Sequence, residues 1–224
     1  MRAEVQYKSK IFGECPSDYD FTKITNSEEL KLLNWIHILQ SIVTRLHLNI
    51  QMYQYYIRLY MFNKVVREQF KTYYTYQLNS LSAMITIDFS CLLHKENELS
   101  VYNLKNFCSK NKNLFIHDIT IVLKKTKNMI KSAEDLYKTY FDIPRKKIFA
   151  HIDELLLEQE KVNEIMKKGS TKTMKKILWY LKRFLNEIWT CYNEHKLCFQ
   201  LENGNDYKKI TELICKHYGD TRFL

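Results

Sequence analysis

Apolar residues recur at helical spacing along most of the chain, and the first such stretch follows Asn26 and Ser27. Asn and Ser are residue types that cap helix N-termini, and Glu28 and Glu29 supply the acidic first turn that helices favour. The apolar positions that follow are Leu32, Leu33, Ile36, Leu39, Ile42 and Val43. This period predicts an amphipathic helix that buries one face.

The same pattern predicts further helices, separated by polar turns or by Gly and Pro. The Tyr-rich region 50–93 is too long for one globular helix, so we expect it to break near residues 76–79 and to form two antiparallel helices. Asp142 and Pro144 mark a later helix start, because Pro lacks the amide hydrogen that a first turn leaves unused. The helices expected after residue 93 cover 100–110, 115–140, 144–168 and 171–192, with a short last one ending near Gly219.

The composition of the chain favours an all-α fold. It has only 4 Gly and 2 Pro in 224 residues, whereas sandwiches and barrels need many tight turns that use both. Apolar residues make up 46% and aromatic residues 14%, which is enough for a packed core. We therefore expect a polar N-terminal extension over residues 1–26 and a single helical domain over 27–224, built as an antiparallel bundle with additional helices.

The net charge of +10 is distributed unevenly along the chain. Residues 101–150 hold eleven Lys or Arg against four acids, and 167–183 hold seven against none, while 151–166 is acidic. Clustered positive charge attracts polyanions, of which nucleic acid is the commonest in cells. A solvated, Lys-rich surface explains the same pattern, and charge alone does not separate the two interpretations.

Two sets of side chains can each be interpreted either as an RNA-binding surface or as an ordinary structural feature. The Tyr run from Tyr53 through Tyr76 would stack bases in an RNA-binding protein, but Tyr at helical spacing more often packs in a core with its hydroxyl at the surface. Lysines at helical spacing would form an RNA track or a solvated face. They form two stripes: Lys124, Lys127 and Lys131, and Lys168, Lys172, Lys175 and Lys182.

The six cysteines include no CxxC pair. Cys191, His195 and Cys198 have a spacing that would place them on one helical face, but no fourth ligand is evident, so we favour packing over a metal site. We expect neither a metal nor a cofactor. Met1–Gly13 lacks the apolar run of a signal peptide and no stretch approaches the roughly 20 apolar residues of a membrane span, so we expect reduced thiols in a cytoplasmic protein.

One segment carries a recognisable motif. The stretch Ile143–Asp153, with the sequence IPRKKIFAHID, resembles the R-x(4–6)-H motif of the HEPN superfamily, and it is most similar to the AbiU-type abortive-infection branch. Residues 85–104, with Asp88 and the polar run Asn97–Asn103, are similar to the helix and turn that precede the motif helix in that branch. The resemblance covers roughly residues 28–200.

This resemblance implies a HEPN-like homodimer in which Arg and His from both copies line one cleft and cut RNA without a metal. Carried over to this chain, it implies that Arg145 and His151 are catalytic, while the neighbouring Lys146 and Lys147 would bind the RNA backbone. It further implies an effector of a prokaryotic abortive-infection or toxin–antitoxin system, restrained by an antitoxin or another regulatory protein.

The chemistry of these residue types agrees with that role. Cleavage of RNA by its own 2′-hydroxyl needs a proton acceptor, a proton donor and positive charge on the phosphate. His titrates near neutrality, and Arg binds a phosphate with two parallel hydrogen bonds. Six residues advance a helix by about 600°, however, so Arg145 and His151 stand about 120° apart. They converge only if the first turn is irregular, if the Arg side chain wraps around the helix, or if the partner chain supplies one of them.

Two alternatives stay open. Lys146 stands where the family usually has Asn, Asp or His, so a catalytically silent HEPN-fold module for RNA binding or dimerisation is the second hypothesis. A basic helical DNA-binding regulator is the third candidate, although no helix-turn-helix signature is evident.

Overall fold

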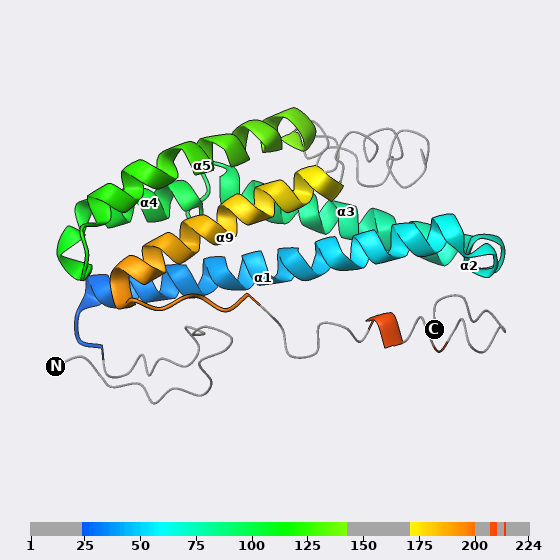
Figure 1. Cartoon of the computed structure of the whole chain (residues 1–224), viewed down its shortest axis with the longest axis horizontal. Coiled ribbons are helices and arrows are strands. Elements are labelled where there is room, and N and C mark those ends of the chain that lie inside the picture. The colour runs from blue at the N-terminus through cyan, green and yellow to red at the C-terminus, as the bar shows by residue number, and fades with distance from the viewer. Residues whose placement is uncertain (1–23, 143–170, 200–206, 210–212, 214–224) are drawn as a thin grey trace.

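The computed structural model describes residues 24–142, 171–199, 207–209 and 213, and all its longer elements are helices (Figure 1). Among these residues an all-α fold is confirmed. The elements are α1 (Ser27–Phe62), α2 (Lys64–Gln69), α3 (Lys71–Leu93), α4 (Val101–Lys110), the 3₁₀ turn η3 (Lys112–Leu114), α5 (Ile119–Tyr140) and α9 (Thr171–Asn193).

Four long helices form an up-down-up-down bundle. Helix α1 packs against α3 and α9, and α5 packs against the other side of α3 and α9. Successive long helices run in opposite directions, so each neighbour in this ring is antiparallel (Figure 1). The short helix α4 lies against α1 and α5 at the end of the bundle where α1 begins. This arrangement buries one stripe of every long helix, as expected of such bundles.

The core follows the predicted apolar faces. In α1 the apolar positions Leu32, Leu33 and Ile36 are fully buried, as the helical period predicts. Helix α9 buries its predicted face in the same way, and its Trp189 has no exposed surface. The buried residues of α9 are Met174, Ile177, Leu178, Leu181, Phe184, Leu185, Ile188, Trp189, Cys191 and Tyr192.

Side-chain caps define several helix starts. The side chain of Asn26 accepts hydrogen bonds from the amides of Glu28 and Glu29, which confirms the predicted start of α1. Ser100 caps α4 in the same way by accepting from the amide of Asn103. Helix α5 begins at Ile119 rather than at residue 115, because Asp118 accepts from the amide of Thr120 at 2.8 Å and therefore forms the N-cap.

The expected break in the Tyr-rich region is wrong by more than ten residues. Helix α1 continues to Phe62, and residues 76–79 lie inside α3. The chain turns at Asn63 instead, whose fully buried side chain accepts a hydrogen bond from the amide of Val66 at 2.9 Å and starts α2. Helical periodicity continues through this point, so the cap is the only local signal of the break.

The Tyr run itself is divided between core and surface. Tyr53, Tyr56 and Tyr74 are buried, and the rings of Tyr56 and Tyr74 meet edge to face with centroids 5.4 Å apart. Tyr73 and Tyr76 are exposed. The prediction that Tyr packs in the core is therefore confirmed for the buried Tyr residues of α1 and α3.

Several predictions from the sequence fall on residues outside those described. These are the N-terminal extension up to residue 23, the helix over 144–168, and most of the C-terminal helix, of which residues 207–209 are helical. None of the described helices is long and apolar enough to span a bilayer.

Replacement of Asn63 by Ala should destabilise the bundle, because it removes a buried cap that two helices share. We expect a loss of about 1–2 kcal/mol in the free energy of unfolding, against a smaller loss for Asn26→Ala at the exposed start of α1. Urea unfolding followed by circular dichroism measures both. Equal losses in the two variants would show that burial of the Asn63 cap adds nothing.

Candidate functional site

The motif residues Arg145, Lys146, Lys147 and His151 lie outside the described residues, but both flanks of their segment are described. Helix α5 ends at Tyr140, and the next residue, Phe141, packs on Phe89 of α3 with ring centroids 5.2 Å apart. Helix α9 begins at Thr171, next to the end of α5 in the same half of the bundle (Figure 1). The bundle therefore holds the two described ends that bound residues 143–170 in the same region of the structure.

The polar residues that precede the motif have structural partners. Asp88 is buried in α3 and accepts two hydrogen bonds from Arg45 of α1, at 2.6 and 3.1 Å. A bidentate pair of this kind keeps the carboxylate charged and ties α1 to α3. Burial works against the charge of Arg45, but the hydrogen bond to Asp88 has the larger effect and raises the pKa of its guanidinium.

The polar turn after α3 is held by Asn side chains. Asn97 donates from Nδ2 to the carbonyl of Ser90 at 3.1 Å, and Asn103 donates to the carbonyl of Asn97 at 2.8 Å. These bonds satisfy carbonyl groups at the end of α3 and in the turn. The run from residue 97 to 103 therefore shapes the α3–α4 connection.

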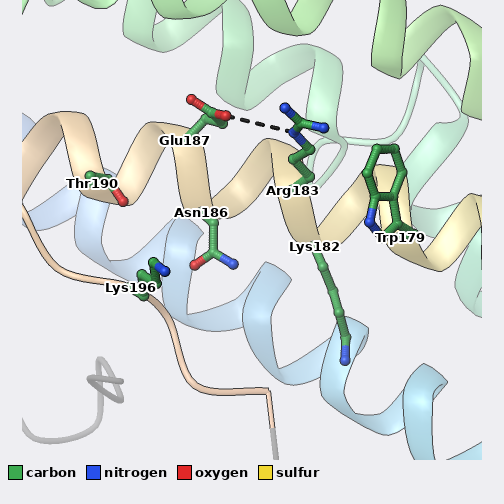
Figure 2. A pocket seen from close by; sticks show the side chains of 7 residues that line it. All are labelled: Trp179, Lys182, Arg183, Asn186, Glu187, Thr190 and Lys196. Atoms are coloured by element: carbon green, nitrogen blue, oxygen red, sulfur yellow. Dashed lines mark ion pairs between the residues drawn. The ribbon is translucent and has the colours of Figure 1, made fainter. Parts of the chain in front are cut away.

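A hollow of about 560 Å³ on the outer side of α9 is the strongest candidate for a binding site among the described residues. Its walls come from α9 and from the extended segment 194–199 that follows it (Figure 2). The side chains at its edge are aromatic, basic or polar. They belong to Trp179, Lys182, Arg183, Asn186, Glu187, Thr190 and Lys196. We call this hollow the α9 groove.

Hydrogen bonds hold the segment 194–199 in place and so form one wall of the α9 groove. Asn186 accepts from the amide of Leu197 at 2.7 Å, and Thr190 donates to the carbonyl of His195 at 3.0 Å. Gln40 of α1 donates to the carbonyl of Cys198. These bonds bring Lys196 to the same hollow as residues of α9 that lie well before it in the chain.

The charge of Lys182 is poorly compensated. Its ammonium nitrogen lies 2.8 Å from Nδ1 of His47 on α1, and no carboxylate lies within ion-pair distance of it among the residues described. Burial lowers the pKa of Lys182 to about 8. Burial, followed by the charge of Lys182, also lowers the pKa of His47. The sequence offered no signal for this pair, since the two residues are 135 positions apart.

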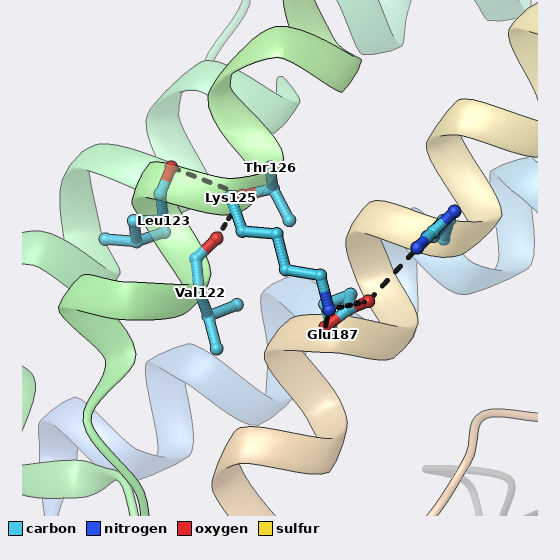
Figure 3. Close-up of polar contacts among 6 residues, drawn as sticks. Val122, Leu123, Lys125, Thr126 and Glu187 are labelled. Atoms are coloured by element: carbon cyan, nitrogen blue, oxygen red, sulfur yellow. Dashed lines mark hydrogen bonds and ion pairs between the residues drawn. The ribbon is translucent and has the colours of Figure 1, made fainter.

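One carboxylate lies on the opposite edge of the groove, and cations already engage it. Glu187 binds Lys125 of α5 at 2.9 Å and Arg183 of α9 at 3.7 Å (Figure 3). Figure 3 also shows Thr126, which donates to the carbonyl of Val122 one turn earlier and is fully buried. The groove therefore keeps an excess of positive charge.

The lysine stripes are partly as predicted. Lys124, Lys127 and Lys131 are exposed on α5, as are Lys172 and Lys175 on α9, whereas Lys168 lies outside the described residues. Lys182 was wrongly placed on the solvated face. It is half-buried because it points toward α1 (Figure 2).

The common helical face expected for Cys191, His195 and Cys198 does not form. Helix α9 ends at Asn193, and Glu194 has a positive φ of 68°, so the last two residues lie in the extended segment. The thiol of Cys191 donates to the carbonyl of His117 at 3.3 Å, which is a packing role. Within the described residues, no group of three His, Cys, Asp or Glu side chains is arranged to hold a metal ion.

Comparison of the chain with protein-family models, with curated proteins and with solved structures finds no match. Its function therefore has to be inferred from its own residues.

Replacement of Lys182 by Met should raise the pKa of His47 toward 6.5, because it removes a positive charge 2.8 Å from the imidazole while the residue keeps much of its volume. NMR titration of the His47 ring protons measures this pKa. The matched control is Lys176→Met, which removes an exposed lysine from the same helix. The assignment of the pair is wrong if both variants leave the His47 titration unchanged.

Proposed function

We propose that this chain is a metal-independent endoribonuclease of the HEPN type, acting as the effector of a prokaryotic abortive-infection or toxin–antitoxin system. In this proposal two copies form a dimer, and the motif residues Arg145 and His151 of both copies line the cleft in which RNA is cut. Lys146 and Lys147 bind the RNA backbone, and a regulatory protein or antitoxin restrains the nuclease.

The observation that best supports this proposal is that the motif lies, in the chain, between the two helices α5 and α9. These helices are antiparallel neighbours, and their adjacent ends bound residues 143–170. Both carry exposed lysines, among them Lys124, Lys127 and Lys131 on α5 and Lys172, Lys175 and Lys176 on α9. RNA drawn to these faces would be concentrated near the helix ends that bound residues 143–170, because phosphate contacts dominate affinity for nucleic acid.

The proposed chemistry is an internal transfer at phosphorus. His151 of one copy takes the proton of the 2′-hydroxyl, whose oxygen attacks the adjacent phosphorus, while His151 of the other copy donates a proton to the leaving 5′-oxygen. Arg145 neutralises the charge that develops on the phosphate oxygens. The products are a 2′,3′-cyclic phosphate and a 5′-hydroxyl, and no metal is required. The two proton tasks explain why a dimer is needed.

A catalytically silent RNA-binding or dimerisation module is the second candidate. Lys146 in place of the usual polar residue favours it, and the α9 groove provides a basic surface that does not depend on the motif. The two candidates differ in one result only, namely whether bound RNA is cut.

Purified protein should cut total cellular RNA and tRNA in EDTA, whereas His151→Ala and Arg145→Ala should each lose at least about 100-fold in rate, because each removes a proton carrier or the phosphate charge. Denaturing gels measure the rate, and end-group chemistry identifies the 2′,3′-cyclic phosphates.

His94→Ala is the matched control, since it removes a histidine at the end of α3 that lines neither the motif segment nor the α9 groove, and it should cut at the wild-type rate. Intact RNA with the wild-type dimer, or equal cleavage by all variants, contradicts the proposal. Bound but uncut RNA favours the silent module instead.

A further inference from the structure

We infer that the α9 groove is a binding site for single-stranded RNA, in which one base stacks on Trp179 and the adjoining phosphates bind Lys182 and Lys196. That the strand is RNA rests on the proposed function. The stacking and the phosphate contacts rest on the groove alone.

The first support is the exposure of Trp179. Half of its surface is open, whereas Trp189, two turns or more further along the same helix, has none. Its ring is held by Tyr180, which meets it edge to face at 5.1 Å, and by the guanidinium of Arg183 at 5.1 Å from the ring centroid. An exposed indole fixed in this way is a preformed stacking platform, and stacking on an aromatic ring accepts any unpaired base.

The second support is the uncompensated charge of Lys182. Among the described residues this half-buried ammonium has no carboxylate partner. It contacts Nδ1 of His47 at 2.8 Å and the ring of Phe199, whose centroid is 5.2 Å away, and neither of these carries a negative charge. A phosphate oxygen would provide the missing negative charge. The negative charge of the phosphate would favour the protonated form of Lys182, and this would strengthen binding near neutral pH.

The third support comes from the contacts that Glu187 and Asn186 make in the groove. Glu187, the one acid that lines it, is already bound by Lys125 and Arg183 and so repels an anion weakly. Asn186 accepts from the backbone through its oxygen, which turns the amide nitrogen away from that bond and toward the groove (Figure 2). The groove thus offers cations and a donor around an aromatic ring, which is the composition of sites that bind single strands.

The position of the groove also suits a substrate that must reach the motif. Trp179 lies eight residues into α9, or about 12 Å along the helix from Thr171, the first described residue after the stretch 143–170 that contains the motif. Lys175 lies between them, close enough to His47 for its charge to affect the imidazole. A strand whose base occupies the groove would therefore pass along a basic helix face toward the start of α9.

Binding of a labelled 2′-O-methyl oligouridylate, followed by fluorescence anisotropy at two salt concentrations, tests this site. The oligonucleotide lacks the 2′-hydroxyl nucleophile, so binding is measured whether or not the chain is a nuclease. Trp179→Ala should weaken binding by about tenfold or more. Lys182→Gln and Lys196→Gln should each weaken it and reduce the salt slope by about 0.7.

Matched controls come from the far side of the bundle. Tyr76→Ala removes an exposed aromatic ring from α3, and Lys110→Gln removes an exposed lysine from α4, so both should bind as wild type. Tryptophan fluorescence gives a second readout, because quenching on binding should disappear in Trp179→Phe only if that indole stacks on a base. Circular dichroism of each variant confirms that it is folded.

The outcomes separate this site from the nuclease. Loss of binding in Trp179→Ala without cleavage by the wild type supports the groove and overturns only the proposed activity. Cleavage by the wild type, together with equal affinity in Trp179→Ala and Tyr76→Ala, overturns the groove and leaves the activity standing. Duplex RNA that binds as tightly as the single strand, with the same loss in Trp179→Ala, also overturns the stacking.

Discussion

The burial of one face of α9 between α5 and α1 is the constraint on which the rest of this structure depends. Leu185, Ile188 and Trp189 have no exposed surface, so the helix cannot rotate about its axis without exposing large apolar area. Because each residue of a helix is turned by about 100° from the last, this buried face also sets the direction of every other side chain. It orients Trp179 outward and Lys182 toward α1, and thereby creates the α9 groove (Figure 2).

In the described part of the bundle, the buried acids and the half-buried Lys182 differ in whether they have a partner of opposite charge. Both carboxylates that are buried in the described part of the chain have cationic partners: Asp88 binds Arg45 at 2.6 Å, and Glu134 binds Lys138 at 2.6 Å. Lys182 has no such acidic partner among the residues that the structure describes. A paired acid already has its counter-charge, whereas a half-buried ammonium that lacks an anion retains its attraction for one from outside. This difference is why the groove, and not the paired acids, is suited to a ligand.

The apolar period predicted the long helices well because each buries one face in the bundle, so the local pattern and the tertiary packing agree. The apolar period did not predict the break at Asn63. Helical spacing continues through this residue, and the break depends on its buried side-chain cap. The period failed again after Asn193, where Glu194 takes a left-handed conformation and removes Cys198 from the helix. In both places a single backbone conformation decided the outcome, and a period averaged over many residues cannot detect it.

The sequence by itself determined the all-α class and the buried faces of α1 and α9, because both depend on residues close together in the chain. Only the tertiary structure decided the α9 groove. Its ammonium–imidazole pair joins residues 47 and 182, and Lys196 is held at the groove because the amide of the next residue, Leu197, donates to Asn186. Such a site forms only after α1, α9 and the segment 194–199 have packed together, so no local pattern along the chain reveals it.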